Sequence, residues 1–129
     1  HGGFTTGTPW IEANPNAHEL NVEQDLIHPD SVFAHYRHLV QIRKDYDVVP
    51  YGHTTPLLEH DPSIMSYQRK LDDQTLLVIG NFSDRPQQPD LPEEAFGEGK
   101  CLIHSHQERS RIEPGLTLAP YESFAILMT

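Results

Sequence analysis

Apolar residues recur at helical spacing in one part of the chain, between residues 29 and 46. These positions lie three or four residues apart and are Val32, Phe33, Tyr36, Leu39, Val40 and Ile42. Such spacing predicts an amphipathic helix with one apolar face. Pro29 suits the first turn, because its fixed φ matches the start of a helix. Val48 and Val49 before Pro50 predict a change to extended chain, and no other segment has a helical pattern of this strength.

Beyond residue 51 the pattern changes to short apolar runs separated by turn residues such as Pro114-Gly115. The expected strands are Thr54–Glu59, Ile64–Lys70, Thr75–Phe82, Lys100–His106, Leu116–Leu118 and Ser123–Met128. Leu76–Ile79 is apolar throughout, as expected for a strand at the centre of a two-layer structure. We also expect one helical turn at Pro92–Phe96. Short strands at this spacing predict an antiparallel β-sandwich.

These patterns predict a mainly β fold, in which a loop and one long helix precede the antiparallel β-sandwich. We expect two domains, residues 1–50 and residues 51–129. An amphipathic helix ahead of a sandwich has to bury its apolar face. It does so either on the sandwich or on a part of the protein outside this sequence.

The composition narrows the possible partners and surroundings. Nineteen acidic and nine basic residues among 129 give a net charge of −10, which argues against nucleic acid and anionic membranes, since both are polyanions. The single cysteine, Cys101, lies in an apolar run, where a small buried hydrophobe is expected, and this fits a reducing, cytoplasmic location. Because the sequence starts at His1, we expect a processed chain or a piece of a longer protein.

Nine histidines prompt a search for a metal site. His104 and His106 alternate along an expected strand, and His35 and His38 lie one turn apart on the helix, so either pair has the spacing for two ligands. No third ligand follows at a fixed offset, so we expect surface imidazoles and no metal. Motifs for a serine nucleophile, a phosphate loop and a dinucleotide are absent. From these residues we predict no catalytic residue and no cofactor.

Several separated motifs resemble one enzyme family. The first segment comprises Gly2–Ile11 (GGFTTGTPWI), Asn14–Asn16 (NPN) and Leu20–Glu23 (LNVE). Further along are Leu76–Phe82 (LLVIGNF) and Leu118–Ser123 (LAPYES). Together with the helix, and in this order, they resemble the α-glucosidase branch of the α-amylase superfamily. This branch includes oligo-1,6-glucosidase, glucan 1,6-α-glucosidase and trehalose-6-phosphate hydrolase.

The resemblance implies the C-terminal part of such an enzyme, namely the end of its truncated (β/α)8 barrel and the C-terminal domain. Family members are retaining glycosidases that use an Asp nucleophile, a Glu acid/base and a second Asp. The sequence carries none of these three motifs. His60-Asp61 is similar to part of the third, but Pro62 places it in a turn, so we reject this match. The implied function is the C-terminal portion of an α-glucosidase for short α-linked gluco-oligosaccharides, with 1,6-linkages favoured and this chain inactive alone.

The same resemblance places the first segment at the barrel end that carries the active site. Phe4 and Trp10 are the substrate-proximal candidates in the complete enzyme, although a packed structural role is the better prediction for Trp10. Without the barrel, we expect this segment to be extended or displaced and Trp10 to be less well packed. The implied partner is the missing catalytic barrel, and a gluco-oligosaccharide substrate would bind only in the full enzyme.

Two alternatives stay open. One is the tail of a trehalose-6-phosphate hydrolase, and the other is an independent carbohydrate-binding β-sandwich. The carbohydrate-binding alternative predicts an exposed row of aromatic side chains on one face of a sheet. The aromatic residues available for such a row are Tyr51, Tyr67, Phe82, Phe96, Tyr121 and Phe124.

Overall fold

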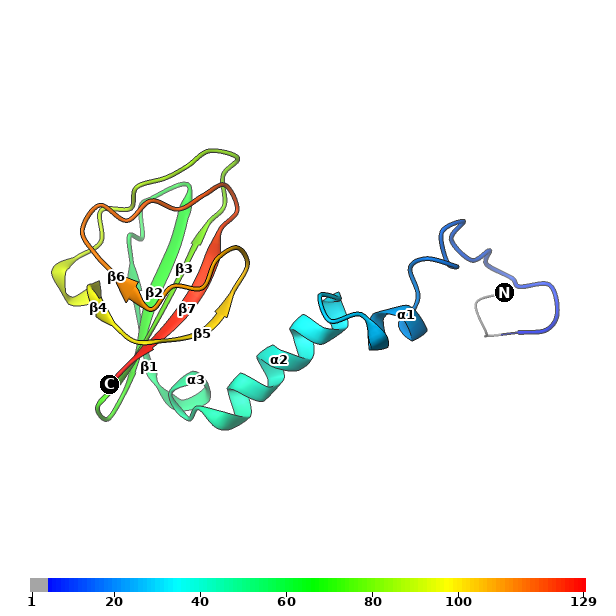
Figure 1. Ribbon diagram of the computed structural model, residues 1–129, viewed down its shortest axis with the longest axis horizontal. Coiled ribbons are helices and arrows are strands. Elements are labelled where there is room, and N and C mark those ends of the chain that lie inside the picture. Colours follow the sequence, from blue (N-terminus) through cyan, green and yellow to red (C-terminus); the bar gives the residue numbers. More distant parts are fainter. Residues whose placement is uncertain (1–4) are drawn as a thin grey trace. The chain divides into compact units, whose positions relative to one another are not determined.

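The computed structural model describes residues 5–129 and contains two compact units (Figure 1). The first unit comprises residues 1–41, and its described part consists of turns and helix. The second unit, residues 42–129, is built on an antiparallel sheet. The predicted division into domains of residues 1–50 and 51–129 stays a prediction.

Two helices begin in the first unit, and each has a polar side chain at its start. Helix α1, Val22–Ile27, is capped by Asn21, whose Oδ1 accepts a hydrogen bond from the Gln24 N–H at 2.9 Å. Helix α2, Val32–Asp45, follows Ser31, whose Oγ accepts from the Ala34 N–H at 3.1 Å. The long helix is therefore confirmed, but it begins at residue 32 because Ser31, and not Pro29, supplies its N-terminal hydrogen bond. Helix α1 was not predicted.

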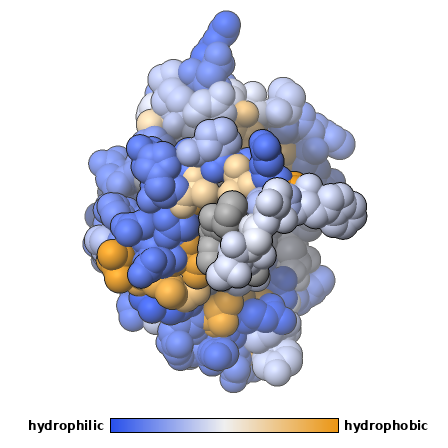
Figure 2. Space-filling view, turned by 90° about the vertical axis from the view of Figure 1, so that its right-hand side faces the viewer, coloured by the Kyte–Doolittle hydropathy of each residue, from blue (hydrophilic) through white to orange (hydrophobic). Residues whose placement is uncertain are grey.

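The first unit has no apolar core within residues 5–41, where Ser31 is the only buried residue. The apolar positions that predicted α2 are exposed up to Val40, and Trp10 is 97% exposed. Figure 2, a view of one face of the chain, shows hydrophobic side chains at the surface among hydrophilic ones. A helix face of this kind is stabilised by packing rather than by propensity, so the unit carries an apolar surface that its own described residues leave uncovered.

A five-stranded antiparallel sheet forms the second unit, in the order β1-β2-β3-β7-β5 (Figure 1). Its strands are β1 His53–Leu57, β2 Ile64–Leu71, β3 Gln74–Asn81, β5 Lys100–His104 and β7 Ser123–Met128. A separate two-stranded sheet pairs β4, Gly97–Glu98, with β6, Arg111–Ile112. The mainly β, antiparallel prediction is confirmed.

The larger core lies between the five-stranded sheet and a second layer made of loops and the small sheet. The sheet contributes Ile64, Leu77, Ile79, Phe124 and Ile126. The second layer contributes Leu91, Ala95, Ile112, Leu116 and Leu118, with Ala95 in the single 3-10 turn η1, Glu93–Ala95. The turn predicted at residues 92–96 is thus confirmed. Two layers are present, but most of the second is irregular chain rather than strand.

A smaller core lies on the other face of the sheet, which we call the outer face. There Ile42 of α2 and Val48 of helix α3, Val48–Tyr51, join a group of buried strand residues. The strand residues are Leu76, Leu102, Ala125 and Leu127. Arg69 of β2 fixes α3, because its Nε donates to the Val48 carbonyl at 3.2 Å and its Nη2 to the Gly52 carbonyl at 2.8 Å.

Helix α3 corrects one expectation. Val48 to Pro50 was expected to be extended, whereas these residues form a helical turn closed by the Gly52 N–H donating to the Val48 carbonyl at 3.1 Å. Pro50 is the third residue of the turn, where a missing N–H removes no helical hydrogen bond. Full burial of Val48 favours this conformation over the extended one.

The predicted strands agree with β1, β2, β3, β5 and β7 apart from their ends. Leu116–Leu118 is not a strand, because Leu118 makes only an isolated bridge with Gln87. Strand β5 ends at His104, so His106 lies in the following loop and the predicted alternation of the two histidines is wrong. Strands β4 and β6 have two residues each, which is too short for a periodic pattern.

Leu77 offers the sharpest test of this core, because its side chain is 0% exposed at the centre of the sheet. Leu77→Ala should lower the free energy of unfolding by about 2–5 kcal/mol, through lost burial and a residual cavity. Urea unfolding of the purified chain, followed by circular dichroism, measures this change. The matched control is Leu20→Ala, which removes the same atoms from a side chain 70% exposed and should change the value by less than about 0.5 kcal/mol. Equal effects of the two substitutions would contradict the core described above.

Candidate functional site

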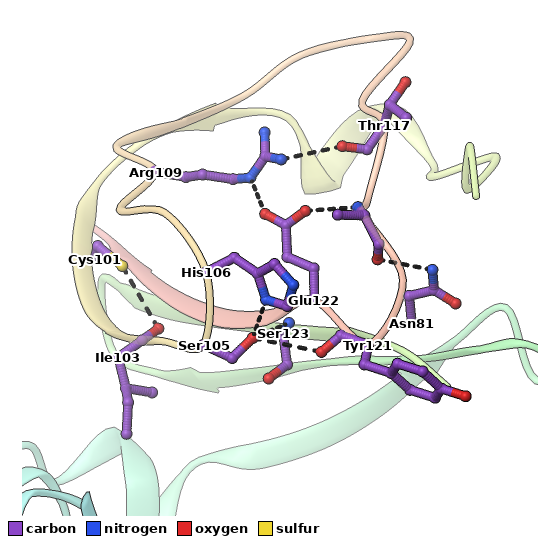
Figure 3. A network of polar contacts seen from close by, with 11 residues as sticks. Asn81, Cys101, Ile103, Ser105, His106, Arg109, Thr117, Tyr121, Glu122 and Ser123 are labelled. Atoms are coloured by element: carbon purple, nitrogen blue, oxygen red, sulfur yellow. Dashed lines mark hydrogen bonds and ion pairs between the residues drawn. The ribbon is translucent and has the colours of Figure 1, made fainter. Parts of the chain in front are cut away.

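The carboxylate of Glu122 is buried and is held by hydrogen bonds within the protein (Figure 3). Its side chain is 2% exposed, and Glu122 is the only buried acidic residue among residues 5–129. Oε1 accepts a hydrogen bond from Arg109 Nε at 2.7 Å, and Oε2 accepts one from the Ala119 N–H, also at 2.7 Å. Both oxygens are therefore engaged within the protein.

A tight turn at Ala119–Glu122 brings the carboxylate to this position. Pro120 has a fixed φ, and Tyr121 follows with a positive φ of 57°, so the chain reverses and the Glu122 N–H donates to the Ala119 carbonyl at 3.1 Å. The side chain of Glu122 then folds back onto the N–H of the first residue of the turn. Strand β7 starts at the next residue, Ser123.

Arg109 connects two loops through this carboxylate. Its Nη2 donates to the Thr117 carbonyl at 3.0 Å, while its Nε reaches Glu122 (Figure 3). The guanidinium also lies over the ring of Phe124, 5.5 Å from its centroid. Arg109 thus joins the loop after β5 to the loop before β7 and packs on Phe124, a residue of the main core.

Asn81 completes the polar network at the end of β3. Its Nδ2 donates to the Arg85 carbonyl at 2.7 Å and to the Ala119 carbonyl at 2.9 Å. Its Oδ1 accepts from the Ser83 N–H at 2.9 Å and from Ser83 Oγ at 2.8 Å. A single buried amide therefore holds the turn after β3 against the turn before β7.

The electrostatics of Glu122 favour the ionised form. Burial acts to raise the pKa of Glu122, but the hydrogen bonds from Arg109 and Ala119, with the attraction of the nearby positive charge, outweigh it and lower the pKa below its ordinary value. A carboxyl that acts as a general acid near neutral pH needs the opposite shift. The arrangement is suited to holding loops together rather than to proton transfer.

The predicted site residues do not gather around this network. Phe4 lies outside the described residues, and Trp10 belongs to the first unit with a fully exposed ring. Their proximity to substrate stays a prediction. His60-Asp61 lies between β1 and β2, where Asp61 Oδ1 accepts from the N–H groups of Ser63 and Ile64 at 2.8 and 3.0 Å, as expected for a turn.

The remaining candidates are equally scattered. Cys101 is half-buried at a bulge in β5, not fully buried as expected, and its Sγ donates to the Ile103 carbonyl at 3.5 Å. Across residues 5–129, no group of three His, Cys, Asp or Glu side chains is arranged to hold a metal ion. Nor does any described helix have the length and apolar character needed to cross a membrane, and the cytoplasmic location stays a prediction.

A groove of about 430 Å³ lies beside the turn between β1 and β2. Its walls are mainly apolar and are formed by Pro56, Leu57, Leu58, Pro62, Met65 and Phe82, among others. In the sequence these residues belong to three expected strands and a turn. Nothing in their local pattern indicated that they would line one concave surface.

Two family models match consecutive parts of the chain. Residues 1–52 match the alpha amylase catalytic domain, and residues 64–124 match the alpha-amylase SusG C-terminal domain. An oligo-1,6-glucosidase of Bacillus cereus is 41% identical over 124 residues, which is 95% of this chain and 22% of that enzyme. A trehalose-6-phosphate hydrolase of Bacillus subtilis is 39% identical over an alignment of 132 residues, covering 100% of this chain and 23% of the relative.

Solved structures agree with the sequence matches. The trehalose-6-phosphate hydrolase of Bacillus licheniformis superposes with a TM-score of 0.80 and 35% identity, over 97% of this chain and 23% of that one. The trehalulose synthase MutB of Pseudomonas mesoacidophila MX-45 gives a TM-score of 0.84 with 31% identity, over the same fractions. The chain belongs to the α-amylase superfamily. It spans 22–23% of the length of these relatives.

The network around Glu122 was not predicted as a site. The motif Leu118–Ser123 contributed to the resemblance, but its glutamate was not assigned a role. The available signal was an acidic residue placed directly before the apolar run Phe124–Met128, where an unpaired charge would be costly. Its partner, 13 residues earlier in a loop, has no local signal at all.

Removal of the arginine tests the network directly. Arg109→Ala leaves the buried Glu122 carboxylate without its cation and should lower the free energy of unfolding by about 3–5 kcal/mol. Urea denaturation at pH 7 measures the change. Arg85→Ala is the matched control, because Arg85 and its neighbour Asp84 form an exposed pair 3.9 Å apart that should contribute less than about 0.5 kcal/mol. A small effect at Arg109 would mean that the carboxylate is hydrated rather than buried.

The lowered pKa of Glu122 predicts a specific dependence of stability on pH. Because the pKa is lower in the folded than in the unfolded chain, the ionised form stabilises the fold above the usual glutamate pKa of about 4.3, and this contribution is lost as the pH falls through the folded pKa. Glu122→Gln should therefore show a shallower loss of stability between roughly pH 5 and pH 2 than the unchanged chain. Chemical denaturation at a series of pH values provides the comparison. The exposed Glu113→Gln serves as control, and a parallel fall for Glu122→Gln and the unchanged chain would contradict the assignment.

Proposed function

We propose that the chain is the C-terminal portion of a retaining α-glucosidase that hydrolyses short α-linked gluco-oligosaccharides. Its own role is structural: it closes the end of the catalytic domain and stabilises it. The observation that carries the proposal is the order of the two family matches, catalytic domain over residues 1–52 and C-terminal domain over residues 64–124. Two oligo-1,6-glucosidases each align with 95% of the chain, across both matched parts.

The chemistry of retaining glycosidases supports an inactive role for this portion alone. That mechanism needs two carboxylates about 5–5.5 Å apart, one of them with a raised pKa. Among the described residues the buried acid is Glu122, whose pKa is lowered and whose oxygens are bound by Arg109 and Ala119. The acid and nucleophile would lie in the part of the relatives that this chain does not cover.

The preference for 1,6-linkages is supported by the names of the relatives. Oligo-1,6-glucosidases of Bacillus cereus and Halalkalibacterium halodurans are 41% and 42% identical to the chain. The trehalose-6-phosphate hydrolases of Bacillus subtilis and Escherichia coli are 39% and 35% identical. Because the difference in sequence identity between the two groups is small, the C-terminal portion of a trehalose-6-phosphate hydrolase is the second candidate function.

The partner in this proposal is the rest of the catalytic domain. The apolar face of α2 has to be covered in a stable protein, and its exposed members include Val32, Tyr36 and Leu39. Trp10 and Ile11 in the preceding segment are also exposed. Packing of this segment and helix within a complete barrel would bury these side chains. In that setting Phe4 and Trp10 would line or support the substrate pocket.

The carbohydrate-binding alternative receives no support from the aromatic side chains. Phe124 is buried in the core, and Phe96 and Tyr67 are half-buried, so Tyr67 adds no exposed ring beside Phe82. The exposed rings belong to separate segments: Tyr51 to α3, Phe82 to the end of β3 and Tyr121 to the turn before β7. They do not form the row on one sheet face that this alternative requires.

An activity assay tests whether this chain is inactive alone and functions as part of a complete enzyme. The isolated chain should not hydrolyse p-nitrophenyl α-glucoside. A chimera in which this chain replaces its 41%-identical counterpart in the Bacillus cereus enzyme should hydrolyse it. The physical reason is that the carboxylate pair would come from the barrel and the packing surface from this chain. Release of p-nitrophenol is followed at 405 nm. Turnover by the isolated chain that Glu122→Gln abolishes and Glu113→Gln preserves would refute the proposal.

A further inference from the structure

The outer face of the five-stranded sheet is covered at only one end. Directly paired residues of antiparallel strands share a face, so the register defines successive rows on this surface. The first row includes Arg69, Leu76 and Leu127, and α3 packs there through Val48. The next rows include Tyr67 with Val78 and then Met65 with Gly80.

Beyond the covered end, apolar side chains lie at the surface. Met65 is 50% exposed and Phe82 is 67% exposed, whereas Tyr67 and Val78 are half-buried and Val78 borders the smaller core. The Phe82 ring belongs to the same surface, because a Cβ built on Gly80 would lie 3.3 Å from it. We call these four residues, Met65, Tyr67, Val78 and Phe82, the outer strip.

The groove beside the turn between β1 and β2 extends the outer strip. Met65 and Phe82 line it together with Pro56, Leu58 and other residues of that turn. The polar residues of its lining are Glu59, Asp61, Ser63 and Ser66. Asp61 already accepts hydrogen bonds from the Ser63 and Ile64 N–H groups, and Ser66 Oγ donates to the Val78 carbonyl. Because most of the lining is aliphatic, thioether or aromatic, the groove matches the apolar surface of a protein better than a sugar, which needs several hydrogen-bonding partners.

The occupant is indicated by the residues already seated on this face. Ile42 and Val48 both lie in the part matched by the catalytic domain, residues 1–52, while the rows beneath them lie in the part matched by the C-terminal domain. The contact between the two matched parts therefore starts on the outer face, one row away from the strip. The chain covers 22% of the Bacillus cereus relative, so most of that relative lies outside the part matched by this chain.

We infer that the outer strip and its groove are the surface on which the C-terminal domain docks onto the catalytic domain, continuing the contact that Ile42 and Val48 begin. The inference rests on the proposed function, since it requires a catalytic domain to precede this chain. The strip is an apolar surface with Met65 and Phe82 as its exposed anchors, and it adds a second attachment to the covalent one. Two attachments on one face would fix the sandwich rigidly against the barrel.

Oxidation of Met65 provides a readout that does not depend on activity. The isolated chain and the chimera with the Bacillus cereus catalytic domain are treated with dilute hydrogen peroxide, and sulfoxide is quantified by peptide mass spectrometry. Met65 should oxidise at least about fivefold more slowly in the chimera, because its sulfur is then covered. Met128, half-buried against the inner core, is the internal reference and should keep its rate.

The outcomes separate the inference from the proposed function. An active chimera in which Met65 oxidises as fast as in the isolated chain overturns the docking surface alone. A chimera with protected Met65 but no glucosidase activity supports the docking surface and overturns the proposed function.

A charge substitution tests the same surface without relying on the oxidation rate. Phe82→Lys should leave the melting temperature of the isolated chain within about 1–2 °C, because the ring is exposed there, and should lower that of the chimera by about 4 °C or more. Tyr121→Lys, an exposed aromatic residue off the strip, should change neither. If the isolated chain sediments as a dimer that Phe82→Lys dissociates, the occupant is a second copy and the inference is overturned.

Discussion

The pairing of β3 with β7 is the constraint on which the second unit depends. These neighbouring strands lie at the centre of the sheet and are buried on both faces: Leu77 and Ile126 point into the main core, and Leu76 and Leu127 into the smaller one. A strand covered on both sides has to be apolar almost throughout, which explains the continuous run at residues 76–79. The loops and the small sheet cover the face of this pair that points into the main core, and α3 covers the face that points into the smaller one.

The network around Glu122 supplies hydrogen bonds to the polar groups that are buried where β3 ends and β7 begins. Asn81 ends β3 and Glu122 precedes β7, and the Asn81 amide and the Glu122 carboxylate both bind the backbone of Ala119 at this end of the sheet. Each buried polar group would be costly without partners, and each has them, from backbone groups of two turns and from Arg109. The carboxylate therefore stabilises the sandwich, and its lowered pKa follows from that structural role.

The two units differ in whether their described residues bury their own apolar side chains. Residues 42–129 enclose two cores and satisfy their buried side chains; no buried side-chain polar atom in the described part of the chain lacks a hydrogen bond. The described residues of the first unit enclose no apolar core and expose Trp10 and the apolar positions of α2 up to Val40. A helix whose apolar face is exposed is expected where another part of a larger structure covers that face.

Features that depend on short-range periodicity can be predicted from the amino-acid sequence. The spacing of apolar residues identified α2, and alternation and turn residues identified β2, β3 and β7, while separated motifs indicated the family. Tertiary structure alone decided that Val48–Tyr51 is helical, that Leu116–Leu118 is not a strand, and that Arg109 meets Glu122. It also decided which apolar residues form the outer strip. Each of these depends on contacts between residues far apart in the chain, and such contacts override local propensity without leaving a pattern in neighbouring positions.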